Sequence, residues 1–298
     1  MSQGAGLRLL CATAHPDDEC LGLGGTIARY AAEGVEVALV VGTRGERGRF
    51  GDGSEPHPGP ERMGEIREGE LRAAADVLGV RHVRFLGYLD GELDRADPRV
   101  AVCRVARIIR ELRPHVVVTF DPYGGYGHPD HIAVSQLATA AVVQAASAAV
   151  VQAASAAGRA ERAPTSGASA TAGAATAAGA TGEPHVVQKL YYMAWTERVW
   201  SHYQRIFKVL RTTLGEQVRS SVAWPDWSVT TTADAHDHWE TVWAAVQCHR
   251  TQMAQYGALE RLTPEDHRGL WGPQECYRVF SLVNGGRERE SDLFEGLR

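Results

Sequence analysis

The sequence predicts an α/β fold in which a mostly parallel sheet is flanked by helices. Over roughly the first 135 residues, short β-branched runs alternate with helix-like patterns, which is typical of βαβ units. The run from His115 to Asp121 has a continuous apolar core that suits a strand buried on both faces. Short polar clusters follow two of the predicted strands, which is where open parallel sheets bind their ligands. We therefore predict a Rossmann-like sheet with the strand order 3-2-1-4-5.

The individual elements follow from local patterns along the chain. The expected strands are Leu7–Ala14, Val35–Thr43, His82–Leu86, His115–Asp121 and Val186–Ala194. The expected helices are Leu21–Glu33, Glu61–Leu78, Asp97–Leu112 and one that begins near His131. The polar, glycine-rich stretch from Arg44 to Pro60 is expected to be a loop. The third helix should end before Pro114, because the residue before a proline disfavours the helical conformation.

Composition divides the chain into a core, an insertion and a cap. We expect residues 1–195 to form the catalytic core. Alanine accounts for 20 of the 44 residues from 139 to 182, and the segment 158–183 lacks the apolar surface that would offset its ordering entropy. That segment is therefore predicted to be a disordered insertion. All seven tryptophans lie at or beyond Trp195, and residues 196–298 are predicted to form a mainly helical C-terminal cap of the same domain.

The overall composition excludes several classes of partner. The formal net charge of −5 and the pI of about 6.2 give no electrostatic footprint for nucleic acid or for an anionic membrane. No uninterrupted apolar stretch is long enough to suggest a membrane-spanning helix. The five cysteines are scattered and form no paired motif, and the N-terminal apolar run is short for a signal peptide. We expect a cytoplasmic protein with reduced thiols.

Two polar clusters carry the candidate chemistry. The first, Ala14–Glu19 (AHPDDE), follows the first strand, and the second, Gly124–His131 (GGYGHPDH), follows the valine-rich strand. Alone, either cluster has a structural explanation as a helix cap or a polar loop. In a 3-2-1-4-5 sheet, however, the two strands are neighbours and both clusters face one crevice.

Such a gathering of histidines and aspartates without an opposing lysine is costly unless a cation lies within it. Zinc binds imidazole nitrogen and carboxylate oxygen, and three protein ligands with an open position are typical of a catalytic site. The same ligands accept iron(II). A carboxylate beside a ligand could take a proton from bound water, and a histidine outside the ligand set could donate one to the leaving amine.

At these residues the sequence resembles the LmbE-like (PIG-L) family of zinc-dependent N-acetylglucosamine deacetylases. Both motifs carry the resemblance, which is closest to the mycothiol-pathway members over Arg110–His131 and returns faintly at Cys248–Gln252. The family is expected to act on small-molecule glycosides by hydrolysing a linear amide bond.

The resemblance implies a role for nine residues of this chain. His15, Asp18 and His131 would hold the zinc, and Asp17 would be the general base. His128 would protonate the leaving amine or stabilise the oxyanion, Asp130 would orient an active-site histidine, and Tyr126 would polarise the substrate carbonyl. Arg67 and Glu46 would contact the substrate.

Two alternative functions remain at this point. One is a thiol S-conjugate amidase of the same family, which needs a deeper apolar pocket that the tryptophan-rich cap could supply. The other is a non-catalytic sugar- or nucleotide-binding module. The loop Gly87–Glu92 has the form of general family members, so the resemblance does not specify an inositol-bearing substrate. An exposed aromatic cap would also suit a homo-oligomer.

Overall fold

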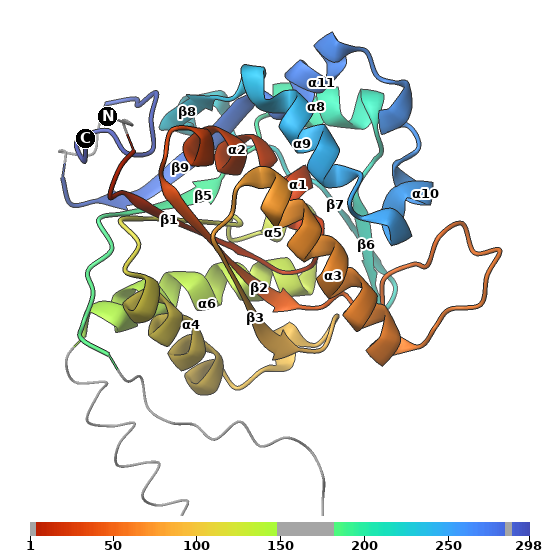
Figure 1. Cartoon of the computed structure of the whole chain (residues 1–298), viewed down its shortest axis with the longest axis horizontal. Helices are drawn as coiled ribbons and strands as arrows, with labels where there is room; N and C mark the ends of the chain where they lie inside the picture. The colour runs from red at the N-terminus through yellow and green to blue at the C-terminus, as the bar shows by residue number, and fades with distance from the viewer. Residues whose placement is uncertain (1–3, 148–181, 284–287) are drawn as a thin grey trace, which may run out of the picture.

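The central feature of the computed structural model is a seven-stranded sheet of order β3-β2-β1-β4-β5-β9-β8 (Figure 1). The structure describes residues 4–147, 182–283 and 288–298. The first five strands in this order are parallel, and β9 and β8 continue the sheet in antiparallel pairing. The predicted Rossmann-like fold and the order 3-2-1-4-5 are confirmed. The strands are β1 (Arg8–Thr13), β2 (Glu36–Thr43), β3 (His82–Tyr88), β4 (Val116–Thr119), β5 (Lys189–Met193), β8 (Thr231–Asp234) and β9 (Pro273–Ser281).

Strand β1 lies at the centre of the parallel part of the sheet. Leu9 pairs with Val37 of β2 on one side and with Val116 of β4 on the other. These three side chains are fully buried, as expected for apolar runs covered on both faces. The residues that follow β1 and β4 are therefore held side by side at the carboxyl edge of the sheet.

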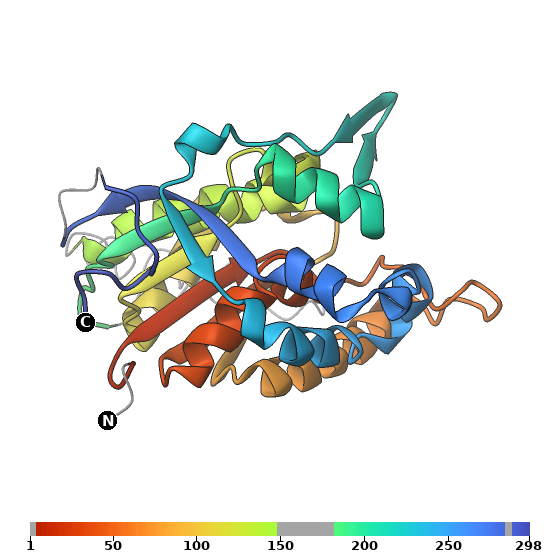
Figure 2. The same cartoon turned by 90° about the horizontal axis from the view of Figure 1, so that it is seen from above.

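Helices cover both faces of this sheet (Figure 2). Helices α4 and α6 pack against each other on one face, and α2, α3 and α9 pack on the other. The helices of the core are α1 (Asp18–Leu21), α2 (Gly24–Ala32), α3 (Pro60–Leu78), α4 (Pro98–Leu112), α5 (Gly124–Gly127) and α6 (Pro129–Ala146). The helix predicted from Leu21 in fact begins at Asp18 and is broken at Gly22, where the Gly22 N–H closes α1 on the Asp18 carbonyl and Leu23 leaves the helical region.

The C-terminal segment contains the predicted helices and, in addition, strands that complete the sheet. Its helices are α8 (Glu197–Ile206), α9 (Trp239–Val246), α10 (Met253–Tyr256) and α11 (Pro264–Trp271), and a hairpin of β6 (Arg211–Leu214) and β7 (Gln217–Ser220) stands apart from the sheet. Strands β8 and β9 were not predicted, because β9 begins with proline and contains the buried charges Glu275 and Arg278. The predicted boundary between core and cap, after residue 195, therefore falls within the sheet, because β8 and β9 belong to the C-terminal segment.

A buried ionic cluster fastens the C-terminal residues to β5. The Glu290 carboxylate accepts hydrogen bonds from Lys189 Nζ at 2.7 Å and from the Tyr191 hydroxyl at 2.6 Å, and it lies 2.6 Å from Arg278 Nη1. All of these charged side chains are almost fully buried. Removing one partner of a buried ion pair is strongly destabilising, because it leaves an uncompensated charge in the interior.

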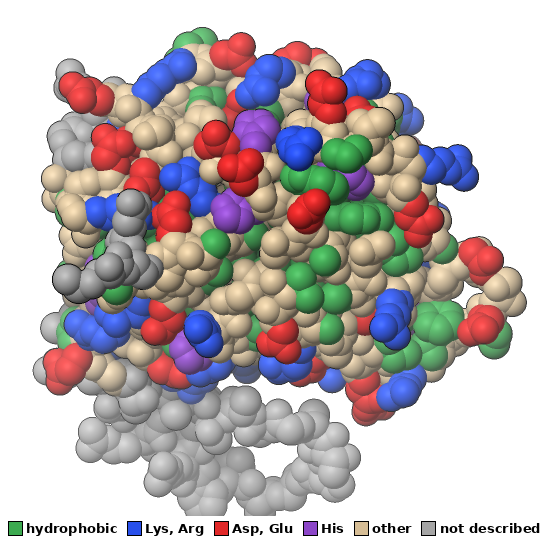
Figure 3. All heavy atoms as spheres, turned by 45° about the horizontal axis from the view of Figure 1, so that its top comes forward, with side chains coloured by type: hydrophobic (Ala, Val, Ile, Leu, Met, Phe, Trp, Pro, Cys, Tyr) green, Lys and Arg blue, Asp and Glu red, His purple; other side chains and the backbone are tan. Residues whose placement is uncertain are grey.

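The insertion predicted at 158–183 lies, except for its last two residues, outside the described residues. On the face of the molecule shown in Figure 3, acidic and basic side chains are interspersed, in keeping with the small net charge. Among the described helices, none is both long and apolar enough to cross a bilayer.

Candidate active site

The two polar clusters meet at the carboxyl ends of β1 and β4, as the sequence predicts. His15 and His131 are 116 positions apart, yet His131 Nε2 lies 3.3 Å from His15 Nδ1. The Asp18 carboxylate completes the group, with Oδ2 3.6 Å from His15 Nδ1 and Oδ1 3.4 Å from His131 Nε2. A tetrahedral ion bound at about 2.0–2.1 Å holds its ligand atoms about 3.3–3.4 Å apart, so this donor set fits a small divalent cation.

Two carboxylates fix the orientation of the His15 ring. His15 Nε2 lies 3.1 Å from Asp130 Oδ2 and 3.2 Å from Asp90 Oδ1, so this nitrogen carries a proton and Nδ1 is the nitrogen left to bind a metal ion. Asp130 is itself fully buried and accepts the backbone N–H groups of Gly91 and Leu93. The histidine that Asp130 orients is therefore His15.

Burial and charge set the protonation of this group. Burial lowers the pKa of His131 to about 3, against the opposing effect of Asp18. Burial also lowers the pKa of His15, but its bonds to Asp130, Asp18 and Asp90 outweigh that effect and raise the pKa well above its usual value. The pKa of Asp18 lies below its ordinary value, because the two histidines outweigh the effect of burial. His131 is therefore neutral and Asp18 is ionised, as metal binding requires, whereas His15 is a cation until a metal ion displaces the proton on its Nδ1.

Asp17 occupies a strained backbone position beside this group. Its φ of 107° lies in the region that side chains with a Cβ rarely adopt. Its N–H donates to Glu19 Oε2 at 2.9 Å, and its Oδ2 accepts hydrogen bonds from Tyr256 at 2.5 Å and from Arg67 at 3.0 Å. Burial raises the pKa of Asp17, while the Arg67 guanidinium and the Tyr256 hydroxyl act to lower it.

Glu19 and His249 form a buried pair beneath Asp17. His249 Nε2 lies 2.6 Å from Glu19 Oε1, and the free Cys20 thiol donates to the same oxygen at 3.0 Å. Burial opposes charge on both partners, yet their attraction lowers the pKa of Glu19 and raises the pKa of His249. The pair holds the carboxylate that receives the Asp17 N–H. The sequence analysis named the segments of Glu19 and His249 but gave neither residue a role, and it did not name Tyr256, since only the fold joins segments about 230 residues apart.

His128 and Tyr126 lie next to the histidine group. The Asp130 N–H donates to His128 Nδ1 at 3.2 Å, so the neutral ring carries its proton on Nε2. Burial, reinforced by the charge of His15, lowers the pKa of His128. Burial and the nearby carboxylates raise the pKa of Tyr126, which keeps its phenol protonated. Both side chains are therefore hydrogen-bond donors at neutral pH.

The two residues expected to contact substrate are both buried. Arg67 is 3% exposed and donates to the carbonyls of Pro16 and Gly45 as well as to Asp17. Glu46 accepts the Asp90 N–H at 3.2 Å and faces Arg44. Arg67 thus supports Asp17, and Glu46 supports the loop that brings Asp90 to His15.

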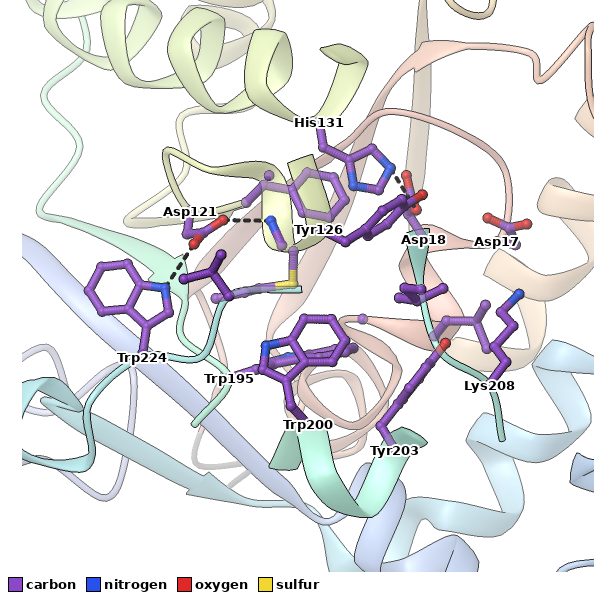
Figure 4. A pocket seen from close by; sticks show the side chains of 18 of the residues that line it. Asp17, Asp18, Asp121, Tyr126, His131, Trp195, Trp200, Tyr203, Lys208 and Trp224 are labelled. Carbon is purple, nitrogen blue, oxygen red and sulfur yellow. Dashed lines mark hydrogen bonds and ion pairs between the residues drawn. The ribbon is translucent and has the colours of Figure 1, made fainter. Parts of the chain in front are cut away.

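A cavity opens beside this site (Figure 4). Asp17, Asp18, Tyr126 and His131 line one side of it, and Trp195, Trp200, Tyr203 and Trp224 line the other. The Trp224 indole donates to Asp121 at 2.8 Å, which closes one end. We call this cavity the aromatic chamber. The cluster of His and Asp side chains forms one of its walls.

A Rossmann-like sheet with histidines and carboxylates converging at its carboxyl edge defines an α/β protein with a candidate metal centre of the hydrolytic type. The family model "PIG-L: GlcNAc-PI de-N-acetylase" matches residues 10–142, which contain both motifs. The 1D-myo-inositol 2-acetamido-2-deoxy-alpha-D-glucopyranoside deacetylase of Kineococcus radiotolerans is 35% identical, over 97% of this chain and 83% of its own length. The chain belongs to the PIG-L family, and the resemblance seen in the sequence is confirmed.

Solved structures extend the comparison of the fold. The N,N'-diacetylchitobiose deacetylase of Pyrococcus horikoshii is 20% identical, with a TM-score of 0.61, over 91% of this chain and 83% of that one. The 4-carboxy-2-hydroxymuconate hydratase of Pseudomonas putida is also 20% identical, with a TM-score of 0.59, over 93% of this chain and 98% of that one. At this identity the likeness shows the fold alone, and the chemistry has to be argued from the site.

Proposed function

We propose that the protein is a metal-dependent hydrolase that removes the acetyl group from an N-acetylglucosamine-containing small-molecule glycoside. The convergence of His15 Nδ1, His131 Nε2 and the Asp18 carboxylate at 3.3–3.6 Å beside Asp17 carries this proposal. Relatives named as deacetylases of a glucosamine–inositol glycoside support the substrate class.

His15, Asp18 and His131 would hold the metal, for which zinc suits the nitrogen and oxygen donors and iron(II) is the alternative. Zinc bound there supplies a water of lowered pKa and polarises the amide carbonyl. Asp130 would act through His15 by fixing its tautomer.

Asp17 would take the proton of the attacking water. Both of its described side-chain hydrogen bonds fall on Oδ2, from Tyr256 and Arg67, which leaves Oδ1 for the proton. Arg67 thereby positions the base, and its own contacts are with protein groups. The strained backbone of Asp17 keeps its carboxylate at the cavity wall rather than along the helix.

His128 and Tyr126 would act on the substrate amide as hydrogen-bond donors. The His128 Nε2–H is the donor that can reach a developing oxyanion or the leaving amine. The Tyr126 phenol remains protonated and would donate to the carbonyl oxygen.

Two other candidates remain. An S-conjugate amidase of the same family would need a deeper apolar pocket, which the tryptophan-lined chamber could supply, and the S-conjugate in the panel below tests it. A module that only binds sugar would not require a strained carboxylate beside a metal-type donor set.

Acetate release from a panel of N-acetylglucosamine glycosides, with and without added zinc, tests the proposal. The panel would contain inositol and malate glycosides, chitobiose and a thiol S-conjugate. Asp17→Asn should retain zinc and lose almost all turnover, and His15→Ala should lose both. His236→Ala, which changes an exposed histidine, is the matched control and should behave as wild type. Zinc-independent sugar binding without acetate release would contradict the proposal.

A further inference from the structure

Lys208 is a charged side chain of the aromatic chamber that lacks a partner of opposite charge among the described residues. The chain contains two lysines, and the other, Lys189, belongs to the buried ionic cluster of Glu290. Lys208 Nζ lies 4.7 Å from the ring centres of Phe207 and Tyr256, which attract a cation through their ring faces. Within the described part of the chain, no oxygen accepts a hydrogen bond from this ammonium group. Its N–H groups are therefore available to a ligand.

The Tyr203 hydroxyl is a second donor at the same end of the chamber. Figure 4 shows Tyr203 and Lys208 near Asp17, whereas Trp224 and Asp121 lie at the opposite end. Burial raises the pKa of Tyr203 well above its usual value, so the phenol stays protonated at neutral pH. None of the described residues accepts a hydrogen bond from this hydroxyl. This end of the chamber thus presents donors, which suit a ligand rich in oxygen acceptors.

Arg49 brings a second positive charge to Lys208 from outside the chamber. Lys208 also lines an open groove between the loop of Arg49 and α10. Burial lowers the pKa of Lys208, and of the nearby charges Asp17 acts to raise it and Arg49 to lower it. Asp52 and Glu55 also line the groove, but in the part of the chain that the structure describes Arg49 forms no ion pair with either. The two cations repel each other, and an anion between them would relieve that repulsion.

The chamber and the groove share Lys208, and this decides which part of a glycoside meets the cations. The amide to be cleaved would lie at the metal-binding group, beside Asp17. An acetyl group is small, so most of the substrate must extend from there toward solvent. The groove is open, and its volume of about 780 Å³ is in the range of small-molecule sites. An aglycone that follows this route passes Lys208 and reaches Arg49.

We propose that the substrate has an anionic aglycone, whose carboxylate or phosphate group binds between Lys208 and Arg49. This inference rests on the proposed function, since the amide that is hydrolysed is the same. The Tyr203 hydroxyl would donate to an oxygen of the same ligand. The glycoside in the name of the Kineococcus radiotolerans relative is uncharged, so the proposed substrate differs from it in charge.

The test compares acetate release from N-acetylglucosaminides whose aglycones are glycerol, glycerate and glycerol phosphate. These aglycones share one carbon skeleton and differ in charge. Hydrogen bonds between charged groups are stronger than those to neutral groups, so kcat/KM should rise at least about tenfold from glycerol to glycerol phosphate, mainly through KM. A gain for both charged aglycones would support either anion, and a gain for glycerol phosphate alone would support phosphate.

Matched variants locate the effect. Lys208→Met removes the charge and keeps an unbranched side chain, so the ratio of kcat/KM for the phosphate substrate to that for the glycerol substrate should fall toward one. Lys208→Arg should retain most of the ratio, and Arg49→Gln should lower it. Both substrates need the same base, so an effect of Lys208 on Asp17 cancels in the ratio. Arg99→Gln, which removes an exposed charge of α4, is the control and should behave as wild type.

Binding to zinc-free protein gives a second readout, which is needed because a phosphate group can itself bind zinc. Isothermal titration should show that the glycerol phosphate substrate binds more tightly than the glycerol substrate. Lys208→Met should remove this difference, and Arg99→Gln should keep it.

The outcomes separate the two proposals. Acetate release with the same kcat/KM for all three aglycones would overturn the anionic aglycone and leave the proposed function standing. A gain for the phosphate substrate that persists in both Lys208→Met and Arg49→Gln would place the anion elsewhere and also overturn this inference. No acetate release by zinc-loaded protein, from these substrates or from the panel above, would overturn the proposed function itself.

Discussion

We predict that the hydroxyl of Tyr256 sets the pH at which Asp17, the proposed base, becomes ionised. It donates to Asp17 Oδ2 at 2.5 Å, and the ring is buried, so Tyr256→Phe removes one hydrogen bond and leaves the packing in place. A hydrogen bond to a charged group is worth about 1.5–3 kcal/mol. At about 1.4 kcal/mol per pKa unit, losing it should raise the pKa of Asp17 by about 1–2 units.

The direction of the change in the pKa of Asp17 follows from the protonation state that the hydrogen bond stabilises. Tyr256 donates to the ionised carboxylate and so lowers the pKa of Asp17, against the burial that raises it. Without that bond the base becomes protonated at a higher pH. The acid limb of kcat/KM should therefore move upward by about 1–2 units, while the rate well above the limb changes little. Arg67 still pairs with Oδ2, so the carboxylate is not left without a partner.

The assay is kcat/KM for an N-acylglucosaminide measured from about pH 4 to about pH 9. Tyr30→Phe is the control, because Tyr30 is equally buried and donates to the carboxylate of Asp292, far from the site. Its pH profile should match wild type. An acid limb that stays in place in Tyr256→Phe would refute the assignment of Asp17 as the titrating base.

Three further predictions concern the metal and the fold. Asp130→Asn should weaken zinc affinity by about 10–100-fold, measured by competition with a chelating dye, because His15 Nε2 keeps only Asp90 as a carboxylate partner; unchanged affinity would contradict this role. Zinc at about 100 times its Kd should raise the free energy of unfolding by about 2.7 kcal/mol relative to chelator-treated protein, and urea titrations that coincide would argue against a resident metal. Glu290→Gln should cost about 3–5 kcal/mol in urea unfolding, since Lys189 and Arg278 lose their charge partner; a loss below about 1 kcal/mol would show that water replaces it.

The parallel part of the fold and the meeting of the two motifs could be predicted, because both depend on local patterns. The valine-rich β4 and the apolar β1 are recognisable as buried strands, and the sheet order then brings His15 to His131. The strand β9 could not be predicted from its pattern, since its interior charges are buried only because distant partners pair with them.

The side-chain contacts of Asp17 could not be predicted from the sequence either. Its contacts with Tyr256, and those of Glu19 with His249, join residues that no periodicity connects. Arg67 was expected at the substrate from the resemblance, whereas its contacts in the structure are with Asp17 and backbone carbonyls. The proposed metal-binding and catalytic side chains lie within the two short motifs, as do the supporting Asp130 and Glu19, whereas Arg67, Tyr256 and His249 come from distant segments.

The long sequence separation between Asp17 and its supports has a consequence for biosynthesis. During synthesis, Tyr256 and the Glu19 partner His249 leave the ribosome 239 and 230 positions after the groups they contact. Domains fold as units once their parts are available, so a nascent or prematurely terminated chain has the metal-type motifs without a positioned base. The base would thus stay without its supports until residues 249–256 have been made.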